Sequence, residues 1–357
     1  MKILFIISSL TSGGAQRVLT TLSNYWVKQG REVTILSILS EDKNFYILDD
    51  KVEIVSLNRR YNNTLLNSLW YLFGIRKVIK SENPTIVISF ISSINIFTLI
   101  SSIGLSTPIL ISERNTFDSL HSKFWRGLRR IVYPWSKGLV VLSQYDYKKF
   151  TYVKSKKIIF NPLNSNNLLE VQFKDKENLL IAVGSLTEQK GFDRLLLALS
   201  MIELTNWKVM IIGEGSKREE LTRLIKTLKL SDKVSLVGRK SNVYNYYKRA
   251  SIFVLSSHWE GFPNVLAEAM AHGCSAIAFD CKTGPSEMIK DGVNGYLVEE
   301  NNIEQLSKKI LETINNKQLR ETFFYNSLKI KDHLDIKKIT IEWEEYIEQI
   351  RMGKEEK

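Results

Sequence analysis

Residues 252–268 read IFVLSSHWEGFPNVLAE, and this segment contains the pattern from which the fold class follows. It opens with a short apolar run at 252–255, continues through a loop, and passes at Pro263 into a pattern typical of a helix. A buried strand that leads through a loop into a helix is the repeating unit of parallel α/β proteins. The fold class therefore depends on how often the chain repeats this unit.

The same alternation runs through most of the chain. Before Pro162, short apolar runs lie at residues 3–7, 33–38, 52–55, 86–90, 109–112 and 139–142. After a polar, aperiodic stretch at 164–178, further runs lie at 179–183, 209–212, 234–237, 252–255, 276–279 and 296–298. Runs separated by helical patterns predict parallel strands joined by crossover helices. We expect an α/β protein with two Rossmann-like, doubly wound domains at 1–163 and 179–335, a linker at 164–178, and a C-terminal helix at 336–357 that packs back on the first domain.

Composition limits the function classes. With 357 residues the chain exceeds the roughly 250–300 that one hydrophobic core supports, in agreement with two domains. The net charge of +12 indicates a polyanionic partner such as nucleic acid, anionic lipid or a phosphate-bearing substrate, although solubility alone would also explain it. We expect no nucleic-acid partner, because the scattered lysines form no recognition motif.

Cysteines and apolar segments indicate the compartment. Cys274 and Cys281 are the two cysteines, and their spacing suits neither a disulfide framework nor a zinc site, which favours a reducing compartment. The apolar region 85–112 is interrupted by serines, Asn95, a glycine and Pro108, so strand–helix–strand fits it better than a membrane span. The apolar start at 3–7 fits a first strand better than a signal peptide. A cytoplasmic protein is expected.

The stretch around Pro263 also predicts a phosphate site. Proline suits the first position of a helix, and the N–H groups that follow it, together with the helix dipole, attract an anion. Phe262, Asn264 and Val265 border this turn. Glu260 precedes the helix and would reach a reacting group, while Glu268 lies a turn into the helix and can accept from two neighbouring hydroxyls. Alternatively, both are ordinary surface carboxylates.

In each predicted domain, the loop after the first strand carries further candidate site residues. In the second domain, Gly184 and Ser185 come directly after the strand and Lys190 follows, so that the lysine would meet a diphosphate unless it is simply solvated. In the first domain, Gly13 and Gly14 lie between a strand and a helix, with Arg17 one turn further on, and would let a substrate approach the backbone. The Gly-x-Gly-x-x-Gly fingerprint of dinucleotide-binding domains is absent.

Over essentially the whole chain these elements resemble the retaining glycosyltransferases of family 4, whose two domains face each other across a cleft in the fold called GT-B. The resemblance implies that Glu260 and Glu268 are the family's spaced glutamate pair and that Lys190 binds the donor diphosphate. It makes Gly13 and Gly14 the amino-terminal loop that faces donor phosphate and acceptor. The resemblance also implies that the turn Val237-Gly238-Arg239 is where the family holds the base of the nucleotide.

Two positions depart from the family pattern. Ser185 stands where family members usually carry an arginine beside the diphosphate, so phosphate neutralisation would depend on Lys190, Arg239 or Arg17. Arg114 stands where many relatives have a histidine after the fifth strand of the first domain. An arginine cannot act as a base at ordinary pH, and we expect it to bind donor phosphate or an anionic acceptor.

The resemblance implies a retaining enzyme that moves a hexose or N-acetylhexosamine from a nucleotide diphosphate sugar, with UDP the expected nucleotide. The expected acceptor is a glycan or a polyprenyl-diphosphate-linked glycan in the synthesis of O-antigen, capsule or lipid-linked oligosaccharide. We expect no cofactor besides the donor, and no metal, because no Asp-x-Asp motif or carboxylate cluster occurs. A nucleotide-sugar epimerase of the same architecture is the alternative.

A mixed basic and aromatic segment at 121–135 predicts contact with an anionic membrane surface. The same domain, which in this family receives the acceptor, contributes further basic and aromatic residues: Arg59, Arg60, Trp70, Tyr71, Arg76 and Lys77. We therefore expect a peripheral position on the inner face of the plasma membrane. The alternative is that the aromatic side chains pack inside the domain while the arginines stay solvated.

Overall fold

The computed structural model describes residues 1–11, 13–39, 46–164 and 168–353. The chain divides into two compact units, the first formed by Met1–Pro162 with Ile336–Lys357 and the second by Leu163–Asp335. Ser12, residues 165–167 of the predicted linker and the charged tail 354–357 lie outside the described residues.

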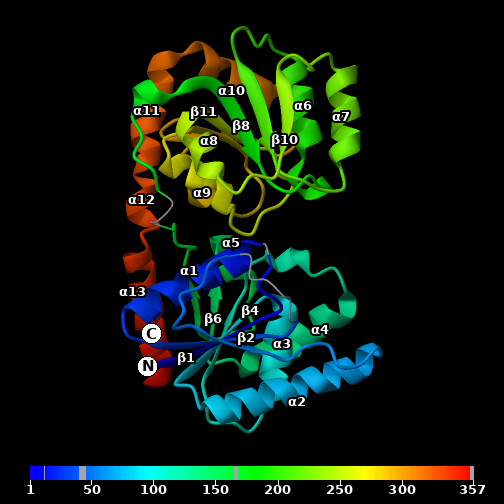
Figure 1. The fold of residues 1–357 in the computed structure, drawn as a ribbon, viewed down its shortest axis with the longest axis vertical. Helices are drawn as coiled ribbons and strands as arrows, with labels where there is room; N and C mark the ends of the chain where they lie inside the picture. The colour runs from blue at the N-terminus through cyan, green and yellow to red at the C-terminus, as the bar shows by residue number, and fades with distance from the viewer. Residues whose placement is uncertain (12, 40–45, 165–167, 354–357) are drawn as a thin grey trace. The chain divides into compact units, whose positions relative to one another are not determined.

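The first unit is built on a parallel sheet with the strand order β3-β2-β1-β4-β5-β6-β7 (Figure 1). The strands are β1 (Lys2–Ile7), β2 (Glu32–Ser37), β3 (Glu53–Ser56), β4 (Ile86–Phe90), β5 (Ile109–Ser112), β6 (Gly138–Val141) and β7 (Lys156–Ile158). Its helices are α1 (Gly14–Lys28), α2 (Thr64–Glu82), α3 (Ser92–Ser101), α4 (Lys123–Val132), α5 (Gln144–Lys149) and α13 (Ile336–Arg351). The strand order reverses between β1 and β4, as it does in doubly wound folds.

Helix α13 is part of the first unit although it comes last in the chain. Trp343 on α13 lies edge-on to Trp26 on α1, with ring centroids 6.4 Å apart. Both tryptophans are fully buried in the same apolar core as the inward-facing residues of β1 and β4. The apolar face of α13 therefore completes the core of the first unit.

The second unit repeats the topology with the strand order β10-β9-β8-β11-β12-β13. The strands are β8 (Glu177–Val183), β9 (Lys208–Ile212), β10 (Val234–Gly238), β11 (Ala250–Leu255), β12 (Ser275–Phe279) and β13 (Gly295–Val298). Its helices are α6 (Phe192–Ser200), α7 (Arg218–Thr227), α8 (Val243–Arg249), α9 (Asn264–Ala271), α10 (Ile303–Asn315), α11 (Lys317–Leu328) and α12 (Ile330–His333). The predicted α/β class with two doubly wound parallel sheets is confirmed.

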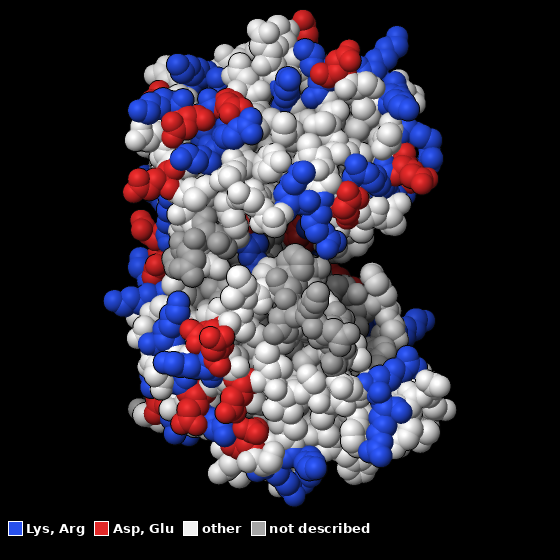
Figure 2. Space-filling model, in the orientation of Figure 1, with Lys and Arg blue, Asp and Glu red and all other residues white. Residues whose placement is uncertain are grey.

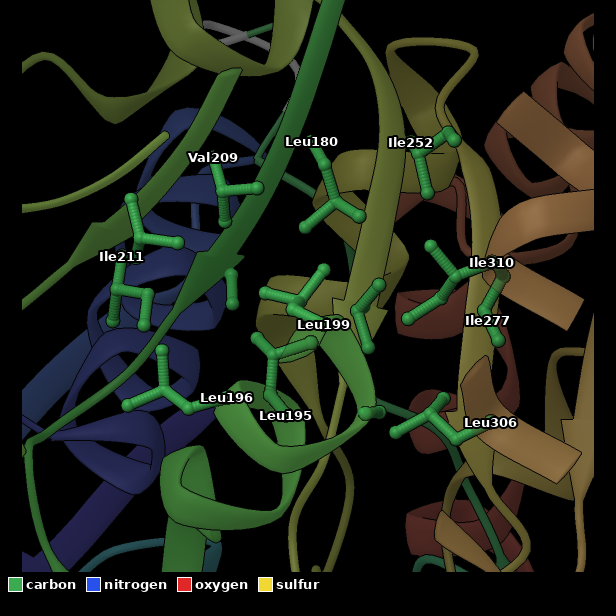
Figure 3. Close-up of a cluster of buried hydrophobic side chains, with 14 of the residues drawn as sticks. Leu180, Leu195, Leu196, Leu199, Val209, Ile211, Ile252, Ile277, Leu306 and Ile310 are labelled. Carbon is green, nitrogen blue, oxygen red and sulfur yellow. The ribbon is translucent and has the colours of Figure 1, made fainter. Parts of the chain in front are cut away.

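Strands covered by helices on both faces must be apolar on both faces, which explains the continuous apolar runs of the sequence. Figure 3 shows one such interface, where Leu195, Leu196 and Leu199 of α6 lie beside side chains of the central strands of the second sheet. Leu306 and Ile310 of α10 join the same cluster. The core thus holds the ends of β8 and β11 in fixed positions.

Three details differ from the sequence-based expectation. Strand β7 was not expected, because its residues Lys156-Lys157-Ile158 carry charge, which an edge strand tolerates. Strand β8 begins at Glu177, two residues inside the predicted linker. Pro263 is the N-cap of α9 and not its first residue. Among the described residues, no helix is long and apolar enough to span a membrane.

Candidate functional site

The candidate site of the second unit lies where the order of its strands reverses. Strands β8 and β11 are neighbours there, and their connections leave in opposite directions. In open parallel sheets, ligands bind beyond the carboxyl ends of the strands at this switch point. Lys190 ends a 3₁₀ turn at Glu188–Lys190 after β8, and Glu260 lies in the loop after β11. Both predicted catalytic residues are thus positioned by the switch point.

The structure brings these two side chains into direct contact. The Lys190 Nζ donates to the Glu260 Oε1 over 2.6 Å, and the side chains are only 16% and 7% exposed. The Ser257 hydroxyl donates to the same carboxylate oxygen at 2.6 Å. A charge-assisted pair with these distances and little water around it has a well-defined geometry.

Gly184 leaves the space that the side chain of Lys190 occupies. A Cβ added at Gly184 would lie 3.1–3.2 Å from the Cγ, Cδ and Cε of Lys190. The aliphatic part of Lys190 therefore lies directly on the backbone at the end of β8. Such close approach is what glycine permits and a larger residue would disturb.

Hydrogen bonds tie the turn that carries Lys190 to the loop that carries Glu260. The Ser256 hydroxyl donates to the Lys190 carbonyl at 2.9 Å. The His258 amide donates to the Gln189 carbonyl at 2.8 Å, and the Gln189 side-chain amide donates to the Trp259 carbonyl at 2.9 Å. The two loops therefore form one hydrogen-bonded unit.

A third loop, after β12, supports Glu260 from its backbone side. The Thr283 hydroxyl donates to the Glu260 carbonyl. Gly284 has a φ of 98°, and a Cβ there would lie 2.5 Å from the Pro263 Cδ, so this loop packs tightly on the start of α9. Burial, to which the charge of Glu260 adds, raises the pKa of the Cys281 thiol to about 12. Cys281 is therefore a neutral packing residue at physiological pH.

Helix α9 begins beside Glu260. The Leu266 amide donates to the Pro263 carbonyl and the Asn264 amide to the Phe262 carbonyl, both at 2.9 Å, so hydrogen bonding within the helix starts at Pro263. Asn264 and Val265 form this first turn, and Phe262 before it is buried. Glu268 lies further along α9 and is 3% exposed, which rules out a surface carboxylate.

Ser185 and Arg239, which the sequence also predicts to bind the nucleotide sugar, are both exposed. Ser185 lies between β8 and the Lys190 turn, and Arg239 directly follows β10. Both positions are at the carboxyl ends of strands, as predicted.

Gly13 and Gly14 lie in the first unit, where Gly13 is the N-cap and Gly14 the first residue of α1. Gly13 has a φ of 176°, which any residue adopts, and a Cβ there would meet only the flexible end of Gln16 at 2.2 Å. The backbone itself therefore does not require glycine at position 13. Arg17 lies one turn further along α1, where its amide donates to the Gly13 carbonyl at 3.1 Å.

Arg114 is buried, whereas the sequence suggested an accessible phosphate-binding residue. Its Nη1 donates to the Asn161 Oδ1 at 2.6 Å, and its guanidinium carbon lies 4.5 Å from the ring centroid of Phe90 and 5.5 Å from that of Trp343. Burial lowers the pKa of Arg114 to about 9. Its Nε and Nη2 are buried with no hydrogen-bond partner among the described residues. The side chain is therefore enclosed between aromatic rings of the first unit, where a phosphate in solution does not reach its guanidinium.

The predicted residues therefore form two groups, one on each unit. The second unit brings Lys190, Glu260 and the start of α9 together, and the first unit holds Gly13, Gly14, Arg17 and Arg114. Several side chains hold Lys190 and Glu260 in place and were not predicted from the sequence. They are Gln189, Arg194, Ser256, Ser257 and Thr283. The Ser-Ser pair directly after a predicted strand was the one available signal.

Over the described parts of the chain, no group of three or more histidine, cysteine, aspartate or glutamate residues could hold a metal ion.

Comparisons with known proteins agree with this division. Residues 166–329 match the family described as "Glycosyl transferases group 1", and residues 12–158 match "Glycosyltransferase Family 4". The chain is 33% identical, over 98% of its own length and 99% of the relative's, to the "GalNAc-alpha-(1->4)-GalNAc-alpha-(1->3)-diNAcBac-PP-undecaprenol alpha-1,4-N-acetyl-D-galactosaminyltransferase" of Campylobacter jejuni. It is 30% identical, over 90% of its length and 92% of the relative's, to the "Amylovoran biosynthesis glycosyltransferase AmsD" of Erwinia amylovora. The solved structure of HepE from Anabaena in complex with UDP has a similar fold, with a TM-score of 0.82 at 18% identity over 98% of this chain and 100% of that one.

Proposed function

The chain belongs to the family 4 glycosyltransferases of GT-B fold, and we propose that it is a retaining enzyme that uses a UDP-sugar. It would move a hexose or N-acetylhexosamine to a glycan or polyprenyl-diphosphate-linked acceptor in the synthesis of a bacterial surface polysaccharide. The observation that carries the proposal is the Lys190–Glu260 pair beside the first turn of α9, at the switch point of the second sheet.

In this proposal the donor diphosphate lies against the first turn of α9. The amides there and the Lys190 ammonium stabilise the negative charge that grows on the leaving diphosphate as the glycosidic bond breaks. Lys190 would leave Glu260 for the phosphate, and Glu260 would then be free to contact the sugar. Glu268 would accept hydrogen bonds from the ribose, and Arg239 would lie near the base.

Retention would follow from attack on the same face as the leaving group. The departing diphosphate takes the proton of the acceptor hydroxyl, so that no carboxylate of the enzyme needs to form a covalent intermediate. The residues of the second unit would then contribute mainly orientation and electrostatic stabilisation.

The names of the relatives support the choice of substrates. The Campylobacter relative is named for transfer of N-acetylgalactosamine to a glycan on undecaprenyl diphosphate, and the Anabaena structure is a complex with UDP. We propose that the first unit receives such an acceptor. Arg17, with the Gly13–Gly14 turn, would bind a phosphate of the acceptor.

The test incubates the purified full chain with a panel of nucleotide sugars and measures nucleoside diphosphate release with and without undecaprenyl-diphosphate-linked glycan. We expect release with one UDP-sugar and a large stimulation by the acceptor. Conversion of the free nucleotide sugar into an isomer without acceptor would instead identify an epimerase. If no nucleotide sugar is consumed under any condition, the proposal is wrong.

We further propose that the first unit binds an anionic membrane surface through α4 and α2, which both pack against α3. On α4 and just after it, Phe124, Ile131 and Trp135 are 71%, 62% and 49% exposed. On α2, Leu65 and Phe73 are 70% and 68% exposed. Exposed apolar side chains on amphipathic helices, next to basic ones, are typical of interfacial binding.

The basic side chains beside these apolar ones are Lys123, Arg126 and Arg130, all exposed. Arg129 and Tyr133 do not belong to this surface, because they are buried in the first unit, where both Nη atoms of Arg129 donate to the Phe117 carbonyl. In the upper half and at the left of Figure 2, Lys and Arg are interspersed with Asp and Glu. The proposed surface therefore rests on the mixture of apolar and basic side chains and not on charge alone.

We expect the double variant Arg126→Glu/Arg130→Glu to bind vesicles that contain anionic phospholipid at least about tenfold more weakly, since each basic residue near such a surface contributes about 1 kcal/mol. Flotation at moderate ionic strength measures the bound fraction. The variant Lys308→Glu/Lys317→Glu changes two exposed lysines of the second unit by the same charge and should bind like the wild type. Equal loss in both variants, or no binding by the wild type, would remove the membrane surface from the proposal.

A further inference from the structure

We propose that Arg194 is a positioning residue for sugar transfer, which holds the loop that carries Glu260 against the turn that carries Lys190. The inference rests on the proposed function, in which those two side chains act on the donor. Arg194 lies in the first turn of α6, just after the turn that ends in Lys190. It acts from behind this turn and does not itself touch the reacting atoms.

The guanidinium of Arg194 joins three segments that are far apart in the sequence. It is 4% exposed, its Nη2 donates to the Ser256 carbonyl, and its Nη1 donates to the Asn301 Oδ1 at 2.6 Å. Its central carbon lies 4.3 Å from the ring centroid of Phe279, at the end of β12. One side chain thus connects α6 with the loops that follow β11 and β13, and with the end of β12.

Ser256 is the point at which Arg194 acts on both functional loops. A Cβ on Gly191 would lie 2.3 Å from the Ser256 carbonyl oxygen and 2.8 Å from the Arg194 Nε, and the φ of Gly191 is 55°. The Lys190 turn, the Ser256 carbonyl and the guanidinium are therefore in mutual contact. The Ser256 hydroxyl also donates to the Lys190 carbonyl at 2.9 Å, so any shift of Ser256 is passed to Lys190.

The loop after Ser256 leads within four residues to Glu260, and Arg194 is the charged donor that fixes where this loop starts. Without the guanidinium, the buried Ser256 carbonyl loses that donor and the loop can move away from the Lys190 turn. Burial lowers the pKa of His258, and the positive charge of Arg194 lowers it further. His258 on this loop is therefore close enough to the guanidinium to interact with it electrostatically. A displacement of about 1 Å at a reacting group can cost about 100-fold in rate.

The experiment compares Arg194→Met and Arg194→Lys with the wild type. We expect Arg194→Met to lower kcat by about 10- to 100-fold while the KM for the donor changes by less than about threefold. Arg194→Lys should recover part of kcat, because an ammonium still reaches one carbonyl. The matched control is Arg320→Met, since Arg320 also donates two hydrogen bonds, to the carbonyls of Thr313 and Ile314, and its guanidinium carbon lies 5.2 Å from the ring centroid of Trp207, away from the site.

Hydrogen exchange gives a second measurement that does not depend on activity. In Arg194→Met, peptides that cover residues 188–191 and 256–260 should exchange faster than in the wild type, because the bonds between the two loops, such as that from the His258 amide to the Gln189 carbonyl, open more often once the guanidinium no longer holds Ser256. Arg320→Met should leave both peptides unchanged. If Arg194→Met does not fold, Asn301→Ala removes one partner of the guanidinium and should shift both readouts in the same direction by less.

The outcomes separate this inference from the proposed function. A wild type that consumes no nucleotide sugar defeats the proposed function, and the exchange data alone then decide whether Arg194 holds the two loops together. A normal kcat in Arg194→Met, or equal acceleration of exchange in Arg194→Met and Arg320→Met, overturns the inference.

Discussion

The variant Lys190→Met is expected to lose about 10³-fold in kcat/KM for the nucleotide-sugar donor. Methionine keeps the length and apolar contacts of the lysine stem on Gly184 and removes only the ammonium. In the proposed reaction that ammonium stabilises charge on the leaving diphosphate, and losing a single donor of this type typically costs about 10²–10³-fold. Initial rates of nucleoside diphosphate release at saturating acceptor measure the effect, and substrate titration separates kcat from KM.

Lys309→Met is the control for this variant. Lys309 also pairs with a glutamate of the second unit, Glu312, at 2.9 Å, but it lies on α10 and outside the proposed site. Its loss should leave kcat/KM within about twofold, because an exposed ion pair contributes little. A Lys190→Met enzyme with near wild-type turnover would mean that the diphosphate is not bound beside Lys190.

The repeating strands made the fold predictable. Central strands such as β8 and β11 are covered on both faces, so nearly all of their residues are apolar. Such continuous apolar runs can be recognised in the sequence. The edge strand β7 is half-buried and basic, and it could not be recognised because an edge strand need not be apolar on both faces. The start of α9 shows the ordinary error of one residue at a helix end, since Pro263 occupies the cap.

The site was predictable in its location and not in its contacts. Lys190 and Glu260 were found because each follows a strand, and the topology of parallel sheets places such residues at one edge. The contact between them depends on side chains from distant parts of the chain, such as Thr283 on the Glu260 carbonyl and Arg194 on the Ser256 carbonyl. No local pattern encodes those partners.

Arg114 illustrates the same limit for burial. A charged residue directly after a strand is expected to face solvent, yet Arg114 is 7% exposed. Its aromatic neighbours Phe90 and Trp343 come from β4 and from the last helix of the chain. The burial of this cation becomes visible only when α13 is known to complete the first unit.

The buried Lys190–Glu260 pair should also contribute strongly to stability. Removing both charges should restore part of the stability that Lys190→Met loses, but none of the activity. Both Lys190→Met and Glu260→Gln remove one partner of a contact that is at most 16% exposed. Lys190→Met leaves a carboxylate buried without its counter-ion, and we expect a loss of about 3 kcal/mol in the free energy of unfolding. Glu260→Gln should cost less, because the amide oxygen still accepts from Ser257 and from the ammonium.

The double variant Lys190→Met/Glu260→Gln removes both charges, so no ion remains buried alone, and it should be more stable than Lys190→Met by about 1–3 kcal/mol. Denaturant unfolding of the four proteins gives this coupling energy. The pair Lys217–Glu220 has the same N–O distance of 2.6 Å but is 38% and 54% exposed, and its cycle should give a coupling below about 1 kcal/mol. The stabilised double variant should keep the loss of about 10³-fold in kcat/KM that is expected of Lys190→Met, because the proposed reaction needs the ammonium whether or not the fold is stable. Recovery of turnover together with stability would show that the pair maintains the fold and takes no part in the transfer.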